Sequence, residues 1–137
     1  MSARPQRPKQ SALLLAEALR KAGIPFVHWK SNGHLAAALA GDTDIDLYVP
    51  PEHRELFENT MRSFGALKIK SQPWSSYPDI EDWLVFDDET GDFLHIHQHF
   101  ALLTGLKRVK HLRLPWGEVL MQNLRTDPGT GWPIPAA

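Results

Sequence analysis

Two aspartates separated by one residue are the clearest chemical signal in this sequence. Asp44 and Asp46 lie in the segment 43–49, where polar and apolar residues alternate as in a β-strand with one buried face. Side chains two positions apart on a strand project from the same face, so the two carboxylates should lie close together. Like charges at that distance repel, and a hard divalent cation such as Mg²⁺ relieves the repulsion. The pair therefore predicts a metal site of the kind that phosphoryl or nucleotidyl transfer requires.

A segment that could bind phosphate comes just before these aspartates. Ser31 and Asn32 precede a predicted short helix over 34–40, whose first backbone N–H groups and dipole would favour an anion. Lys30 adds a full positive charge beside them. Tyr48 follows the aspartates on the same face of the predicted strand, where it could line a pocket. These four residues are the predicted substrate-binding residues.

Three histidines alternate along a later predicted strand over 92–100. His95, His97 and His99 would point to one face of that strand. Three interpretations are open: a polar face in contact with water, a completion of the aspartate site, or a separate transition-metal site. A neutral imidazole can act as a general base near pH 7, and it can replace a carboxylate as a metal ligand, which favours Mn²⁺ or Zn²⁺ over Mg²⁺.

The run 28–49, HWKSNGHLAAALAGDTDIDLYV, resembles the core of the nucleotidyltransferase superfamily with the DNA polymerase β-type palm. Such a core has a strand, a Gly-Ser-type turn, a short helix, and then a strand with two aspartates separated by one residue. The resemblance implies that Ser31 contacts the triphosphate of a nucleotide and that Asp44 and Asp46 bind Mg²⁺ or Mn²⁺. It also implies a nucleoside triphosphate as one substrate and a small molecule, a protein or RNA as the acceptor.

Two positions depart from the family pattern. Lys30 stands where the family has a glycine before the serine. The third carboxylate of the family lies on a later strand beside the two aspartates, and the matching strand here carries histidines instead. We therefore expect His95 or His97 to act as the base, and His95 to join Asp44 and Asp46 as a metal ligand.

The elements that would position these residues alternate along the chain. Helices are predicted over 12–22, with Ser11 as the N-cap, and over 34–40, 51–64 and 115–124. Strands are predicted over 26–29, 43–49, 67–70, 83–87 and 92–100. This order predicts the α/β (α+β) class, with a nucleotidyltransferase-like mixed β-sheet and helices packed on one face.

Length and composition indicate one compact domain. The chain has 137 residues, no cysteine and a net charge of -1, which excludes disulfides, thiolate zinc sites and a general basic field for nucleic acid. We expect the domain to span 10–126, between an N-terminal tail over 1–9 and a Pro- and Gly-rich C-terminal tail or linker over 127–137. No apolar run approaches the roughly 20 residues that cross a bilayer, and no secretory signal pattern is present. The expected location is the cytoplasm, without membrane contact.

The sequence thus predicts a metal-dependent nucleotidyltransferase that moves a nucleoside monophosphate from a triphosphate such as ATP to an unknown acceptor. A domain of this size is small for the task, so we expect a homo-oligomer or an additional domain of a longer protein. Two alternatives stay open. One is a catalytically impaired module that binds nucleotide or metal within a larger protein. The other is a histidine-based domain that binds a transition metal.

Overall fold

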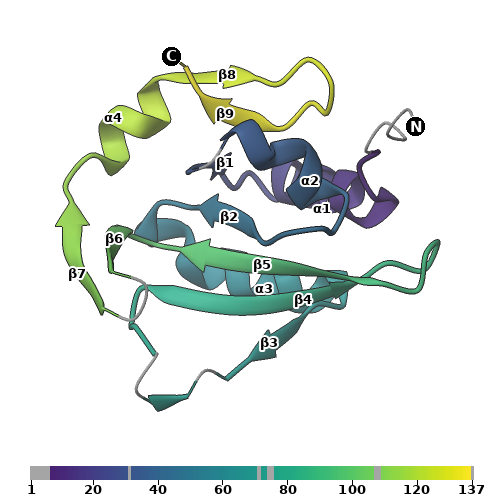
Figure 1. The fold of residues 1–137 in the computed structure, drawn as a ribbon, viewed down its shortest axis with the longest axis horizontal. Coiled ribbons are helices and arrows are strands. Elements are labelled where there is room, and N and C mark those ends of the chain that lie inside the picture. Colours follow the sequence, from purple (N-terminus) through teal and green to yellow (C-terminus); the bar gives the residue numbers. More distant parts are fainter. Residues whose placement is uncertain (1–6, 31, 71, 74–75, 107–108, 137) are drawn as a thin grey trace.

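The computed structural model describes residues 7–30, 32–70, 72–73, 76–106 and 109–136. Its main element is a five-stranded mixed sheet with the strand order β1-β2-β5-β4-β3 (Figure 1). In that order the strands are β1 Val27–His28, β2 Ile45–Tyr48, β5 Phe93–His99, β4 Ile80–Phe86 and β3 Leu67–Ile69. β2 and β5 are parallel, and the other neighbouring pairs are antiparallel. The parallel pair places the aspartate strand next to the histidine strand.

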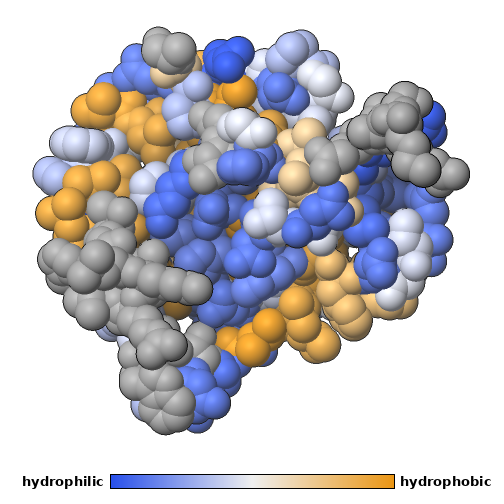
Figure 2. Space-filling model, viewed as in Figure 1, coloured by the Kyte–Doolittle hydropathy of each residue, from blue (hydrophilic) through white to orange (hydrophobic). Residues whose placement is uncertain are grey.

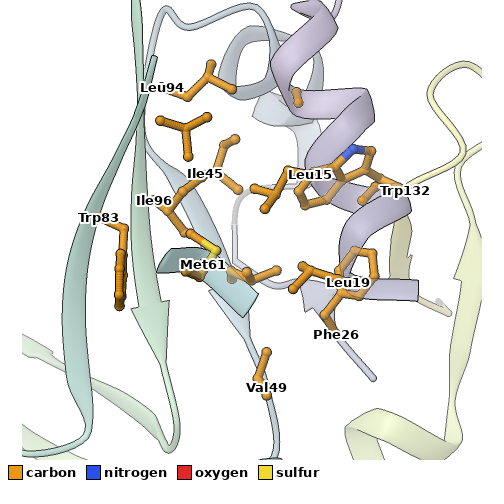
Figure 3. Packing of buried hydrophobic residues seen from close by; sticks show 14 of the residues in the cluster. Leu15, Leu19, Phe26, Ile45, Val49, Met61, Trp83, Leu94, Ile96 and Trp132 are labelled. Atoms are coloured by element: carbon orange, nitrogen blue, oxygen red, sulfur yellow. The ribbon is translucent and has the colours of Figure 1, made fainter. Parts of the chain in front are cut away.

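Three helices cover one face of this sheet. They are α1 Gln10–Lys21, α2 Leu35–Leu39 and α3 Arg54–Phe64, and the short 3-10 helices η1 Asn32–His34 and η2 Pro51–His53 lead into α2 and α3. Each of the three contributes buried apolar side chains to the main core. Figure 3 shows Leu15 and Leu19 of α1 on the side that faces Ile45 and Ile96 of the sheet. The predicted class, a mixed sheet with helices on one face, is therefore confirmed.

Alternation along the strands divides the sheet into a core face and an open face. Ile45 and Leu47 of β2, and Leu94 and Ile96 of β5, are buried among the helices. The side chains between them point to the opposite face, because neighbours along a strand alternate. This opposite face, called the open face below, carries the aspartates and histidines identified in the sequence.

The C-terminal part of the chain packs around the β1 end of the sheet. It consists of β6 Leu102–Leu106, β7 Val109–Leu114, α4 Gly117–Gln122, β8 Leu124–Thr126 and β9 Pro133–Pro135. Val27, Tyr48 and Leu102 are buried there against apolar residues of β7 and α4. α4 therefore lies apart from the three helices of the core face (Figure 1).

The prediction of a C-terminal tail over 127–137 is wrong for the described residues. β9 pairs with β8, and Trp132 is fully buried, packed edge to face on Phe26 with ring centroids 5.5 Å apart. Burial of a large indole offsets the entropy lost when a Pro- and Gly-rich segment becomes ordered. The prolines and glycines favour a tail, and the burial of this one tryptophan outweighs them.

The N-terminal boundary of the domain also lies earlier than predicted. Residues 1–6 of the tail expected over 1–9 lie outside the described residues. Lys9 belongs to the folded part, because its backbone N–H donates to the carbonyl of Leu39 at 2.7 Å and its Nζ lies 3.1 Å from Oδ2 of Asp92. The folded domain therefore includes at least one residue of the predicted tail.

The N-terminus of α1 is capped by a side chain from a distant turn. The helix begins at Gln10, so Ser11 lies inside it and is not the N-cap. The Ser11 N–H donates instead to Oδ1 of Asp87 at 3.0 Å. Burial raises the pKa of the Asp87 carboxyl, but hydrogen bonds from Thr90 and Ser11 outweigh this effect and lower the pKa to about 2. Asp87 therefore stays charged and stabilises the start of the helix.

The structure of the described residues contains no helix that is both long enough and apolar enough to cross a membrane.

Candidate functional site

Charged and titratable side chains from three adjacent strands gather on the open face. They are Asp44, just before β2, Asp46 of β2, Asp82 of β4, and His95, His97 and His99 of β5. Asp46 lies opposite His97 in the β2–β5 pair, and His97 lies opposite Asp82 in the β4–β5 pair. Figure 2 shows a hydrophilic surface across the middle of the molecule in this view, with hydrophobic surface on two sides of it.

Asp46, His97 and His99 form a compact group on this face. The Oδ1 atom of Asp46 lies 3.2 Å from Nδ1 of His97 and 3.6 Å from Nε2 of His99. One possible ligand atom from each residue lies within 4.8 Å of the others, close enough for all three to bind one metal ion. The three residues, called the Asp-His-His cluster below, are therefore a candidate metal site.

His99 is the enclosed member of the Asp-His-His cluster. Its side chain has 0% exposure, and neither ring nitrogen has a hydrogen-bond partner in the part of the chain that the structure describes. Its ring packs edge to face on Trp29, with centroids 5.1 Å apart. Burial, together with the neighbouring His97 and the positive charge of Lys30, lowers the pKa of His99 to about 4 against the opposing effect of Asp46. His99 is therefore neutral near pH 7, with a lone pair that a metal ion could accept.

Asp46 supplies the negative charge of the cluster. Burial raises the pKa of this carboxyl, but the hydrogen bond with His97 and the adjacent imidazole of His99 lower the pKa well below its usual range. Asp46 is consequently ionised at neutral pH. A half-buried carboxylate beside a neutral imidazole is a favourable position for a cation.

His95 joins two carboxylates on the more exposed side of the face. Its Nδ1 lies 2.9 Å from Oδ1 of Asp44, and its Nε2 lies 2.8 Å from Oδ1 of Asp82. A neutral imidazole has a single N–H, so donation to both carboxylates requires the protonated ring. The hydrogen bond with Asp82 raises the pKa of His95, and the charge of Asp44 adds to this effect against burial. While both contacts persist, neither ring nitrogen is available to a metal ion.

The structure thus regroups the expected metal ligands. The sequence predicts Asp44, Asp46 and His95 around one ion. His95 instead contacts Asp44 and Asp82, and the group of described residues within reach of one ion combines Asp46 with the next two histidines of β5. His97, expected as a base, belongs to this group.

Asp82 is a site residue that the sequence analysis did not identify. The predicted strand began at residue 83, whereas β4 begins at Ile80 and includes Asp82. Its neighbour Glu81 points to the core face and accepts a hydrogen bond from Nε1 of Trp83 at 2.9 Å. The alternation of Trp83 and Val85 was a usable signal. If this alternation is continued two residues towards the N-terminus, Glu81 falls on the core face and Asp82 on the open face.

Of the predicted phosphate-binding residues 30–32, Lys30 is the one whose side chain the structure describes, and it lies near the Asp-His-His cluster. Ser31 lies outside the described residues, and so does the side chain of Asn32, whose backbone begins η1. Lys30 has a left-handed backbone with φ 62°, and its Nζ lies 4.6 Å from the centroid of the Trp29 ring. Its positive charge reaches His99, whose pKa it helps to lower. The cation of this turn therefore lies within electrostatic reach of the cluster.

Tyr48 is buried at the end of β2, opposite His99 in the β2–β5 pair. It lines a pocket of about 570 Å³ together with Glu52 and Glu118. Burial raises the pKa of Tyr48, and the charges of Glu52 and Glu118 raise it further. Any side chain at Gly117 would clash with the Tyr48 hydroxyl, so this close approach of α4 to β2 requires glycine.

Comparison of the chain with protein-family models, with curated proteins and with solved structures finds no match. The functional inference therefore depends on the residues of the open face.

Proposed function

We propose that this chain is a metal-dependent nucleotidyltransferase, which transfers a nucleoside monophosphate from a nucleoside triphosphate to an acceptor. One observation carries the proposal. On the open face, Asp46 contacts both His97 and His99, and Asp44 lies two residues before Asp46 in the chain. A cluster of metal-binding side chains beside a cationic turn can bind a divalent ion and the phosphates attached to it.

The donor set of the cluster fits a divalent ion that accepts both oxygen and nitrogen ligands. Mn²⁺ meets this requirement better than Mg²⁺, which prefers oxygen. The buried ring nitrogens of His99, which make no hydrogen bond among the described residues, support a role as a ligand. A divalent ion held here would neutralise the negative charge that develops on the phosphates during transfer.

The side chains around the cluster would position the triphosphate and move a proton. Lys30 lies at the turn beside the cluster, and His95 is positively charged while it bridges its two carboxylates. Both cations would attract phosphate oxygens. His97 can act as the base only while Asp46 and His99 alone hold the ion. In the tautomer that donates Nδ1–H to Asp46, Nε2 of His97 then keeps the lone pair that can take a proton from an acceptor hydroxyl.

The backbone of Lys30 supports the resemblance to nucleotidyltransferases. The family has glycine at this position, and Lys30 adopts φ 62°, a left-handed conformation that glycine enters without steric cost. The turn therefore has a backbone typical of glycine although the residue is lysine.

Titration calorimetry with Mn²⁺ and ATP tests the proposal. ATP should bind much more tightly when the ion is present, and Asp46→Asn should remove that gain because it removes the charge of a ligand. Asp88→Asn is a matched control, since Asp88 is exposed in the turn between β4 and β5. Equal ATP affinity in the wild type and in Asp46→Asn, with the ion present, contradicts the proposal.

A transfer assay then separates catalysis from binding. ATP labelled at its α-phosphate is incubated with Mn²⁺ or Mg²⁺ and with separate pools of small molecules, proteins and RNA. Label should appear in one pool with the wild type and with Asp88→Asn, and it should be absent with Asp46→Asn. Tight metal-dependent binding of ATP without label in any pool would indicate a binding module without transferase activity.

A second candidate function is a histidine-based transition-metal domain. The observation that favours it is the donor set of two imidazoles and one carboxylate, which suits Zn²⁺ as well as Mn²⁺. Titration with Zn²⁺ distinguishes the two functions. Tight Zn²⁺ binding that ATP does not alter, together with no transfer of label, indicates the transition-metal domain.

A further inference from the structure

An apolar pocket of about 440 Å³ opens beside the Asp-His-His cluster. Its walls include Trp29 after β1, Leu102 of β6, Leu114 of β7, and Trp116 and Leu120 at α4. Among the described residues that line this pocket, Lys30 is the only charged one. A volume of this size is within the range of pockets that bind small molecules.

Trp29 connects this pocket to the candidate metal site. Its backbone N–H donates to the carbonyl of Asp46 at 3.0 Å, and its ring packs against the ring of His99 with centroids 5.1 Å apart. The Nζ of Lys30 lies 4.6 Å from the centroid of the same indole. A molecule in the pocket would therefore have its apolar part on Trp29 and a cation within reach of any negative group attached to it.

The chemistry of the walls indicates a flat aromatic group with an anionic extension. Trp116 offers a face for stacking, Trp29 and several aliphatic side chains offer apolar contact, and the positive charge of Lys30 lies over the ring of Trp29. Trp116 is 57% exposed, so part of its ring is available for stacking.

We infer that this pocket binds the base of the nucleoside triphosphate, with the phosphates directed to Lys30 and the Asp-His-His cluster. The inference rests on the proposed function and adds to it the place where the nucleotide is recognised. Stacking on an indole requires only the face of a base, so Trp116 should contribute to the affinity for any of the four nucleotides.

Calorimetry with ATP and with inorganic triphosphate, each with Mn²⁺, tests this inference. Trp116→Ala should weaken ATP binding about 5-fold to 100-fold, the effect of losing one stacking contact, and should leave triphosphate binding unchanged. Trp116→Phe keeps an aromatic ring and should recover most of the loss. Phe86→Ala is the control, because Phe86 is an aromatic residue of similar exposure, 51%, that does not line the pocket.

The two ligands separate failure of this inference from failure of the proposed function. If triphosphate binds and Trp116→Ala leaves the affinity for ATP unchanged, the base lies elsewhere and the inference is overturned while the proposed function stands. If neither ligand binds to the wild type with Mn²⁺, both are overturned. Weaker binding of both ligands to Trp116→Ala also overturns the inference, because Trp116 would then act on the phosphates.

Discussion

Trp132→Ala should lower the free energy of unfolding by about 3–5 kcal/mol. The Trp132 side chain has 0% exposure and packs on Phe26 in the main core. A buried tryptophan removes about 150–250 Å² of surface from water, which at about 25 cal/mol per Å² corresponds to about 4–6 kcal/mol. The surrounding residues recover part of this loss by moving into the space. The indole N–H has no hydrogen-bond partner among the described residues, so the substitution breaks no hydrogen bond there.

Urea denaturation followed by circular dichroism measures this loss, and Trp116→Ala provides the matched control. Trp116 is 57% exposed, so the same substitution there should cost less than about 1 kcal/mol. Trp132→Phe, which keeps part of the buried surface, should give an intermediate value. Equal and small losses for Trp132→Ala and Trp116→Ala would refute the reasoning, since the segment 127–137 would then behave as a tail.

Three further predictions concern the ends of elements and the open face. Asp87→Asn should cost about 1–2 kcal/mol by removing the charged cap of α1. Folding lowers the pKa of Asp87 to about 2. The contribution of its charge to stability is therefore present above the unfolded pKa of about 4 and is lost as the pH falls towards 2. Urea denaturation at several pH values measures this loss. Asp82→Asn should lower the pKa of His95 in NMR titrations of the metal-free protein, and an unchanged pKa would contradict the bridge between carboxylates. Because folding raises the pKa of His95, its contribution to stability is complete below about pH 6.5 and is lost as the pH rises through the folded pKa. Lys30→Gly should change stability by less than about 1 kcal/mol, whereas Lys30→Val, a β-branched residue at positive φ, should cost about 1–3 kcal/mol in thermal melts.

Alternation made much of the open face predictable from the sequence. A period of two residues places Asp44 and Asp46 on one face of their strand and His95 and His97 on one face of theirs. The apolar residues between them fill the core in the structure. The aspartates and the histidines can share one face only if their two strands are neighbours in the sheet. The resemblance to nucleotidyltransferases implied this neighbourhood, and the parallel β2–β5 pair shows it.

The contacts between strands could not be predicted in the same way. Asp82 contacts His95 because β4 pairs with β5 in one particular register, and no local pattern states which residues of two strands lie opposite each other. The burial of Trp132 against Phe26 likewise joins distant parts of the chain. Composition favoured a tail there, and the tertiary contact overrode it.

The core and the candidate site depend on the same alternation in β5. Leu94 and Ile96 lie in the core, and a shift of this strand by one residue would expose them and bury the imidazoles. Burial of these two side chains therefore determines which way the histidines point. Carboxylates on the neighbouring strands then decide which histidines can bind an ion. Both ring nitrogens of His95 contact carboxylates, those of Asp44 and Asp82. His97 and His99 instead lie around a single carboxylate, that of Asp46.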